Sequence, residues 1–399
     1  MTQPPAFSRL LPTAAALFLI ALGLRPQIVA IGPLLPAIQA DLGMNHTVAG
    51  LLATIPVLCM GVFALGGPWL GRLLGTERAI AASVAAIVLF GLLRAAAPEP
   101  ISLLVLTFGL GVGVGAVGPL LPLVVHQRAA SKAAVVTGIY ATGIVLGATL
   151  SGALAVPLAG AGLDWRIPLA AFALATLGGL LCWLVLERPS KPIREPDIET
   201  PRLPWLRRRA WALALLFAAQ STMFYAANSW LPTIYVERGW PEAHAGLLVG
   251  LMNGISLLTT IGGPALAQRL GSRRESLVMW SVVSLTGVLG ISLLPELTVL
   301  WVLMLGLGLG AVFPLVLTLP VDFAARGDGN AAGLAAIMLF GGYSLASLGP
   351  FVFGLLRDAT GAFDVSLWLI VGVAIVKLAM SWAFVPRRLG GGHEKGPGR

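Results

Sequence analysis

The sequence predicts an all-α membrane protein with twelve transmembrane helices in two related halves. Three observations support this fold class. Of the 399 residues, 57% are hydrophobic and only 11% are charged, whereas soluble domains carry about 25% charged residues. Apolar runs long enough to cross a bilayer recur along the whole chain. Several segments of the first half are repeated in the second half at a nearly constant offset.

The first apolar run starts close to the N-terminus, where it could be mistaken for a secretory signal peptide. It is too long for a signal peptide and contains Arg25, so we interpret it as the first membrane helix. The twelve predicted membrane helices lie at residues 12–38, 47–70, 79–97, 101–126, 133–158, 165–186, 209–236, 244–268, 276–294, 298–321, 332–356 and 364–386.

A polar segment separates the first six runs from the last six. It reads ERPSKPIREPDIETPRLPWLRRR and is too rich in proline and charge to span a membrane. We therefore predict an N-terminal six-helix bundle over 1–186, a cytoplasmic linker loop over 187–208, and a C-terminal six-helix bundle with a short cytoplasmic tail over 209–399.

The basic residues predict the orientation of the helices. Of the 26 Lys and Arg residues, twenty fall on the side that holds both termini and the linker, which the positive-inside rule makes cytoplasmic. The net charge of +9 thus reflects topology, and we expect no nucleic-acid partner. Arginine outnumbers lysine heavily and Ala, Gly and Leu dominate, which favours a bacterium with a GC-rich genome. With twelve predicted spans, the expected location is the bacterial inner membrane. Four basic residues fall on the other side: Arg94, Arg166, Arg238 and Arg357.

The two halves repeat in sequence. LLPAIQADLG at Leu34–Gly43 matches WLPTIYVERG at Trp230–Gly239, an offset of 196 residues, and GGPWLGRLLGTER at Gly66–Arg78 matches GGPALAQRLGSRR at Gly262–Arg274 at the same offset. Such a duplication indicates two halves related by an axis along the membrane normal, with a substrate site between them.

The chain resembles the major facilitator superfamily in three features. These are the twelve helices, the central cytoplasmic loop and the turn with glycine and arginine after helices two and eight. LRPQIVAIGPLLPAIQADLG (Leu24–Gly43), together with AGLLATIPVLCMGVFA (Ala49–Ala64), resembles the cyanate permease and 2-nitroimidazole transporter family. The resemblance implies the major facilitator fold of two pseudo-symmetric six-helix bundles. It also implies that helices 1, 4, 7 and 10 line the central cavity.

Arg25 is the main candidate for substrate binding. It is the only formal charge between Leu10 and Ile38, roughly 20 Å from either end of that helix, and a charge at that depth normally faces a cavity or a partner. A guanidinium presents five donors in a plane, which suits a small planar anion. The alternative is a structural arginine bonded to helix-end carbonyls or to a neighbouring helix. Pro26 is expected to kink the helix beside it.

The repeat places a neutral residue, Ser221, opposite Arg25. Ser221, Tyr225 and Asn228 are spaced to share one face of helix seven, and we expect Tyr225 and Asn228 to be second contacts, with hydrogen bonding between helices as the alternative. Asn253 and Tyr343 lie near mid-depth in helices eight and eleven and are further candidates. Phe224 and Phe340 could form an apolar wall, although ordinary core packing is the simpler interpretation.

Candidate gating residues lie at the cytoplasmic helix ends. The superfamily turn after helix two usually carries an aspartate that latches the gate, and here Gly71 occupies its place while Arg72 and Arg78 remain. His126 and Arg128 end helix four and could belong to the same gate, or could be a solvated helix end. Lys377 is a second deep charge, for which we expect snorkelling or structural support.

No cofactor or metal site is expected. GVGVGAVG at Gly111–Gly118 contains the letters of a dinucleotide-binding motif, but it lies in mid-membrane and indicates close helix packing instead. The sequence contains no HExxH or GxSxG motif and no pair of membrane carboxylates, so these signs of an intramembrane enzyme are missing.

The sequence therefore predicts a secondary active or facilitative transporter. Its expected substrate is a small anionic or dipolar solute resembling cyanate, a nitro compound or a carboxylate, moved by a monomer in the lipid bilayer, with protons as a candidate coupling ion. The alternatives are a drug-type multisubstrate exporter of the same superfamily and, remotely, an intramembrane enzyme.

Overall fold

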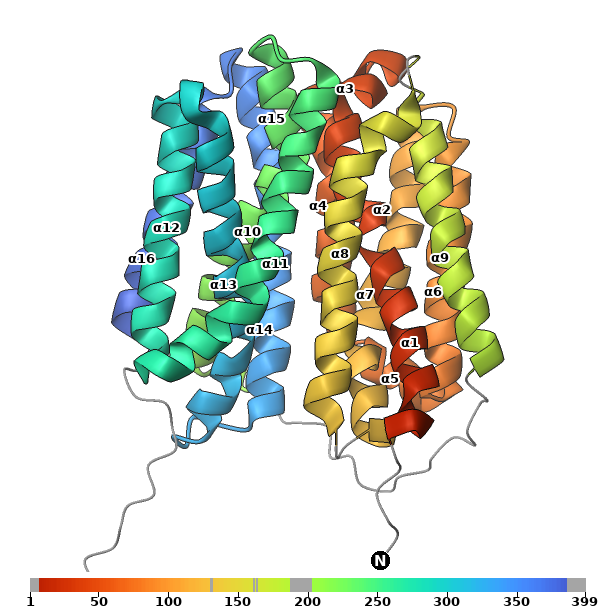
Figure 1. Ribbon diagram of the computed structural model, residues 1–399, viewed down its shortest axis with the longest axis vertical. Helices are drawn as coiled ribbons and strands as arrows, with labels where there is room; N and C mark the ends of the chain where they lie inside the picture. The colour runs from red at the N-terminus through yellow and green to blue at the C-terminus, as the bar shows by residue number, and fades with distance from the viewer. Residues whose placement is uncertain (1–6, 130–131, 161, 163, 187–202, 386–399) are drawn as a thin grey trace, which may run out of the picture.

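The computed structural model describes residues 7–129, 132–160, 162, 164–186 and 203–385, and this part of the chain is helical, with no strand. It contains twelve helical spans long and apolar enough to cross a membrane. The helices run side by side as an upright bundle (Figure 1). The predicted fold class is therefore confirmed. The linker from 187 to 202 and the tail from 386 lie outside the described residues.

The helices of the N-terminal half are α1 (Phe7–Leu24), α2 (Pro26–Val29), α3 (Ile31–Leu42), α4 (His46–Ala64), α5 (Gly67–Leu74), α6 (Thr76–Ala95), α7 (Pro100–Ala129), α8 (Ala133–Ala159) and α9 (Arg166–Leu186). The helices of the C-terminal half are α10 (Arg208–Glu237), α11 (Glu242–Leu270), α12 (Arg273–Leu293), the 3₁₀ turn η2 (Pro295–Leu297), α13 (Thr298–Ala324), α14 (Ala331–Ala346), α15 (Leu348–Thr360) and α16 (Asp364–Phe384).

Prolines explain why the first and eleventh spans are broken. Pro26 lacks an N–H, and the helix is interrupted at Arg25 and again at Ala30, which divide it into α1, α2 and α3. The kink expected beside Arg25 is thus present. Ser347 separates α14 from α15, and Pro350 nearby cannot donate to the carbonyl four residues earlier.

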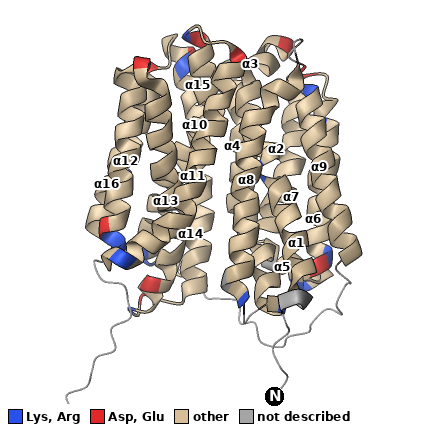
Figure 2. Ribbon diagram, viewed as in Figure 1, with Lys and Arg blue, Asp and Glu red and all other residues tan. Residues whose placement is uncertain are grey.

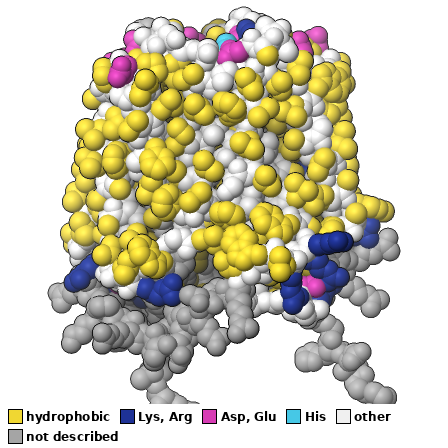
Figure 3. All heavy atoms as spheres, turned by 180° about the vertical axis from the view of Figure 1, so that it is seen from behind, with side chains coloured by type: hydrophobic (Ala, Val, Ile, Leu, Met, Phe, Trp, Pro, Cys, Tyr) yellow, Lys and Arg dark blue, Asp and Glu magenta, His cyan; other side chains and the backbone are white. Residues whose placement is uncertain are grey.

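The two ends of the bundle carry almost all the charge. Figure 2 shows Lys, Arg, Asp and Glu gathered at both ends, with the middle of the helices nearly free of them. We call the end that holds the C-terminal ends of α3, α10 and α15 the apical face, and the opposite end, where α1 begins, the basal face. Figure 3 shows yellow apolar side chains around the sides between these ends, as expected for a surface that faces lipid.

The halves meet where α3 packs against α10 and α11, α4 against α14, α15 and α10, and α8 against α11. Because lipid is as apolar as leucine, such contacts depend on close packing through small residues. At Gly32 of α3 a Cβ atom would collide with the backbone carbonyl of Asn228 in α10. Within the N-terminal half, a Cβ on Gly113 would lie 2.7 Å from the Ser83 carbonyl, which supports the packing interpretation of the glycine-rich run.

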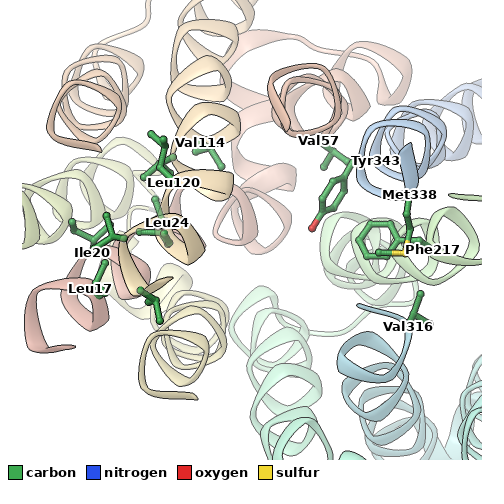
Figure 4. Close-up of a cluster of buried hydrophobic side chains, with 14 of the residues drawn as sticks. Leu17, Ile20, Leu24, Val57, Val114, Leu120, Phe217, Val316, Met338 and Tyr343 are labelled. Carbon is green, nitrogen blue, oxygen red and sulfur yellow. The ribbon is translucent and has the colours of Figure 1, made fainter. Parts of the chain in front are cut away.

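One apolar cluster brings together side chains of both halves. It includes Leu17 and Leu24 of α1, Val57 of α4, and Phe217 and Tyr343 of the C-terminal half. Figure 4 shows Val57 beside Tyr343, with the tyrosine hydroxyl directed away from Phe217. The cluster surrounds the middle of the molecule and positions the polar groups described next.

Candidate functional site

A cavity lies between the two halves near the middle of the helices. Its volume is about 60 Å³, enough for a few water molecules. The walls are mostly apolar, with polar groups at a few points. The lining residues used below are Arg25 of the N-terminal half and Gln220, Ser221, Tyr225, Asn253 and Tyr343 of the C-terminal half.

Arg25 is held in the cavity by aromatic side chains. Its Nη1 donates a hydrogen bond of 2.5 Å to the Tyr225 hydroxyl, and its guanidinium carbon lies 5.6 Å from the centre of the Phe224 ring and 5.7 Å from that of Tyr225. The Tyr343 hydroxyl also interacts with the guanidinium. Arg25 is partly exposed, so the remaining donors can reach a molecule in the cavity.

The two tyrosines form a small aromatic wall opposite Arg25. Tyr225 and Tyr343 have ring centres 6.4 Å apart, and Phe217 packs edge-on against Tyr343 at 4.9 Å. The Tyr225 hydroxyl also lies 3.5 Å from the Met60 sulfur, across the interface between the halves. Both hydroxyls are thus placed by packing, with Arg25 as their charged neighbour.

The two candidate asparagines bind each other. Asn253 Nδ2 donates to Asn228 Oδ1 over 2.8 Å, and Asn228 Nδ2 donates to the Phe224 carbonyl over 2.8 Å. Asn228 is 2% exposed and does not line the cavity, whereas Asn253 does. The geometry of Asn228 therefore favours the alternative of a bond between helices, and its role in substrate binding stays a prediction.

Gln220 links the cavity to a buried lysine. Its Nε2 donates to the Leu309 carbonyl over 2.8 Å, and its Oε1 accepts from Lys377 Nζ over 3.2 Å. Lys377 also donates to Ser284 over 2.7 Å and is fully buried. The lysine does not snorkel, so the structure supports the alternative of a supporting role. The sequence places Gln220 on helix seven but does not indicate that it contacts a buried charge, because Lys377 lies 157 residues away.

Arg94 is a third buried cation. It ends α6 at the apical side, as its sequence position indicates, yet it is fully buried. Its Nη2 donates over 2.8 Å to the carbonyl of Gln27, in the short helix α2 that follows Arg25. The arginine therefore supports the broken first span, because the interruption at Ala30 leaves a backbone carbonyl in need of a donor.

No carboxylate among the described residues forms an ion pair with Arg25, Arg94 or Lys377. The described part of the chain also contains no group of three His, Cys, Asp or Glu placed to bind a metal. The cavity thus offers one accessible guanidinium, two tyrosine hydroxyls, a serine hydroxyl and two amides, a set of groups that can hold a small anion.

The predicted gating residues lie at the basal ends of α5, α6 and α7. Arg128 Nη2 binds Glu77 at 2.8 Å within the N-terminal half, while Arg72, Arg78 and His126 are exposed. None of the ion pairs between described basal residues joins the two halves. Their gating role stays a prediction.

The acidic residues of the sequence repeat occupy matching positions at the apical face. Asp41 binds Arg166 at 2.7 Å, and Glu237 binds Arg357 at 3.1 Å, each pair within one half. The bonds from Arg166 and from the Trp165 indole lower the pKa of the Asp41 carboxyl. The duplication therefore preserves a link between the first helix of each half and the hairpin formed by its fifth and sixth helices.

Comparisons with known proteins agree with this architecture. Residues 14–350 match the model of the Major Facilitator Superfamily. The chain is 32% identical to the cyanate transport protein CynX of Escherichia coli (strain K12), over 93% of this chain and 97% of that protein. It is 28% identical to the 2-nitroimidazole transporter of the same organism, over 92% and 93% respectively. Among solved structures, a D-xylose-proton symporter shares the fold, with a TM-score of 0.76 at 14% identity over 96% of this chain and 99% of the symporter.

Proposed function

Because this chain belongs to the Major Facilitator Superfamily, a family of transporters rather than enzymes, we propose that it moves a small anionic or strongly dipolar solute across the bacterial inner membrane by alternating access. The position of Arg25 supports this proposal most strongly. Its guanidinium is partly exposed in a cavity between the halves and has no carboxylate partner among the described residues.

The chemistry of the cavity supports this class of solute. Two hydroxyls and two aromatic rings hold the guanidinium in place, and a preorganised donor set loses little entropy on binding. A solute with a planar negative group supplies the charge that the described residues do not. The guanidinium and the tyrosine hydroxyls in the cavity wall favour a polar solute over the apolar compounds of a drug-type exporter.

We infer the orientation from the charge distribution. The basal face holds the start of α1, the end of α9, the start of α10 and most of the described basic residues, and the positive-inside rule assigns such a face to the cytoplasm. The apical face is then external. On this assignment the linker and both termini are cytoplasmic.

Uptake into proteoliposomes tests the proposed solute class. Labelled cyanate, a small carboxylate and a nitroimidazole are offered to the unmodified protein and to the variants Arg25→Gln and Arg25→Lys. The control is Arg238→Gln, because Arg238 lies at the apical end of α10 and donates to the backbone carbonyl of Ile291. We expect at least one solute to be taken up and both Arg25 variants to lose most of it. Normal uptake by both Arg25 variants would exclude the anion site, whichever solute is transported.

A further inference from the structure

His46 joins the two halves at the apical face. It is the first residue of α4, in the N-terminal half, and both of its ring nitrogens meet carboxylates of the C-terminal half. Nδ1 lies 2.8 Å from Asp358 Oδ1 and Nε2 lies 3.3 Å from Glu237 Oε1. Among the ion pairs whose partners are both described, these two alone cross between the halves.

The start of α4 holds Asp358 independently of the imidazole ring. The backbone N–H groups of His46 and Thr47 donate to the two carboxylate oxygens over 3.2 and 2.7 Å, and the Thr47 hydroxyl donates over 2.6 Å. A helix N-terminus favours a negative charge at this point. Asp358 is therefore kept as an acceptor beside the ring, although all three side chains of the cluster are partly exposed.

The hydrogen-bonding capacity of the ring determines its charge state in this arrangement. Ionised carboxylates only accept hydrogen bonds, and a neutral imidazole has a single N–H to donate. Only the doubly protonated ring can donate to Asp358 and to Glu237 at once. We propose that His46, Glu237 and Asp358 form a proton-binding site shared by the two halves, occupied when the apical face is closed.

Charged and aromatic groups from several neighbouring segments surround the His46 ring. Arg357 of α15 binds Glu237 at 3.1 Å, which leaves Asp358 as the carboxylate without an arginine partner among described residues. The rings of Trp230 and Phe363 lie 5.8 Å from the His46 ring. Further charged side chains at the apical ends of neighbouring segments are Asp41, which is paired with Arg166, and Glu99, Arg238 and Asp364.

Transport requires this link to break. Alternating access moves the halves apart at one face while they close at the other, so the proton is bound tightly only in the apically closed state. By linkage, acidification favours the closed apical face, and this preference weakens as the pH rises. Each transport cycle would therefore bind and release a proton at the apical face. This proton site rests on alternating access alone and does not depend on which solute is moved.

Distance measurements across the apical face test this proton site. Spin labels are placed at Ala96→Cys and Leu297→Cys, in a background with Cys59→Ser and Cys182→Ser, and the protein is studied in lipid discs without solute. For one coupled proton we expect the ratio of closed to open molecules to fall by up to about tenfold for each unit of rising pH. His46→Gln cannot titrate, and its ratio should change by less than about twofold between pH 5.5 and 7.5.

The matched control is His244→Gln, which removes an exposed histidine near the apical start of α11. It should retain the pH dependence of the unmodified protein. Asp358→Asn provides a second variant, should His46→Gln fold poorly, and it should weaken the dependence by removing one of the two charged acceptors. A ratio independent of pH in the unmodified protein would overturn the proposal, as would a full pH dependence in His46→Gln or in Asp358→Asn.

Discussion

Adding one methyl group at Gly50 should open the apical face. Gly50 lies on α4, one turn after His46, against α15 of the other half. A Cβ atom there would lie 2.6 Å from the Pro350 carbonyl oxygen and 3.1 Å from the Phe351 Cα. Ordinary contacts of this kind begin at 3.4 Å, so the two helices would have to separate by several tenths of an ångström. Both obstructing atoms belong to the backbone and cannot turn aside.

We expect α4 and α15 to separate when the apical face opens, so that the cost falls on the closed state alone. Overpacking typically costs 1–3 kcal/mol, which shifts the equilibrium from closed to open by roughly 5- to 150-fold. The spin-label pair at Ala96 and Leu297 reports this shift directly. We expect Gly50→Ala to move most molecules to the longer distance while the protein remains folded.

Gly178→Ala is the control for this experiment. Gly178 lies in α9, and a Cβ atom there would meet nothing within 4 Å, so the closed population should stay unchanged. If Gly50→Ala gave the same distance distribution as the unmodified protein, the proposed separation of α4 from α15 during opening would be wrong. Loss of folding without opening would show that the contact persists in both states.

Three further substitutions test individual contacts of the cavity. Tyr225→Phe removes the acceptor for Arg25, and we expect the KM for uptake to rise severalfold because the guanidinium loses its orientation. Lys377→Met removes a buried basic group that has no carboxylate partner among described residues, so the Tm should not fall. The same variant releases Gln220, which lines the cavity, and the KM for uptake should therefore rise. Asn253→Ala breaks the bond to Asn228 and should lower the stability by about 0.6–2 kcal/mol in a thermal-unfolding assay.

Much of the fold could be predicted because membrane helices are encoded locally. Length and apolarity define each span, and the repeat at an offset of 196 residues relates the halves without any structure. Arg25 could be identified in the same way, since a lone charge in an apolar run is visible in the sequence alone. Its kinked surroundings followed from Pro26.

Contacts between distant segments could not be predicted. Asn228 shares a helical face with Tyr225, yet its amide is hydrogen-bonded to Asn253 and to the Phe224 carbonyl. The sequence does not indicate a role for His46, because its two carboxylate partners lie 191 and 312 residues further along the chain. Spacing along one helix indicates which side chains share a face, whereas the distance between helices decides which of them meet a cavity or each other.

The three cations of the interior divide into two supporting residues and one that is free to bind. Arg94 and Lys377 are fully buried, and their bonds go to neutral oxygens of Gln27, Gln220 and Ser284. Neither side chain lines the cavity.

Arg25 differs because it is partly exposed and retains donors beyond its bond to Tyr225. In a medium of low dielectric constant, the guanidinium of Arg25 disfavours the entry of cations and stabilises a negative charge beside it. Part of the free energy spent on placing this cation between the helices is thus recovered when an anion or a strong dipole occupies the cavity.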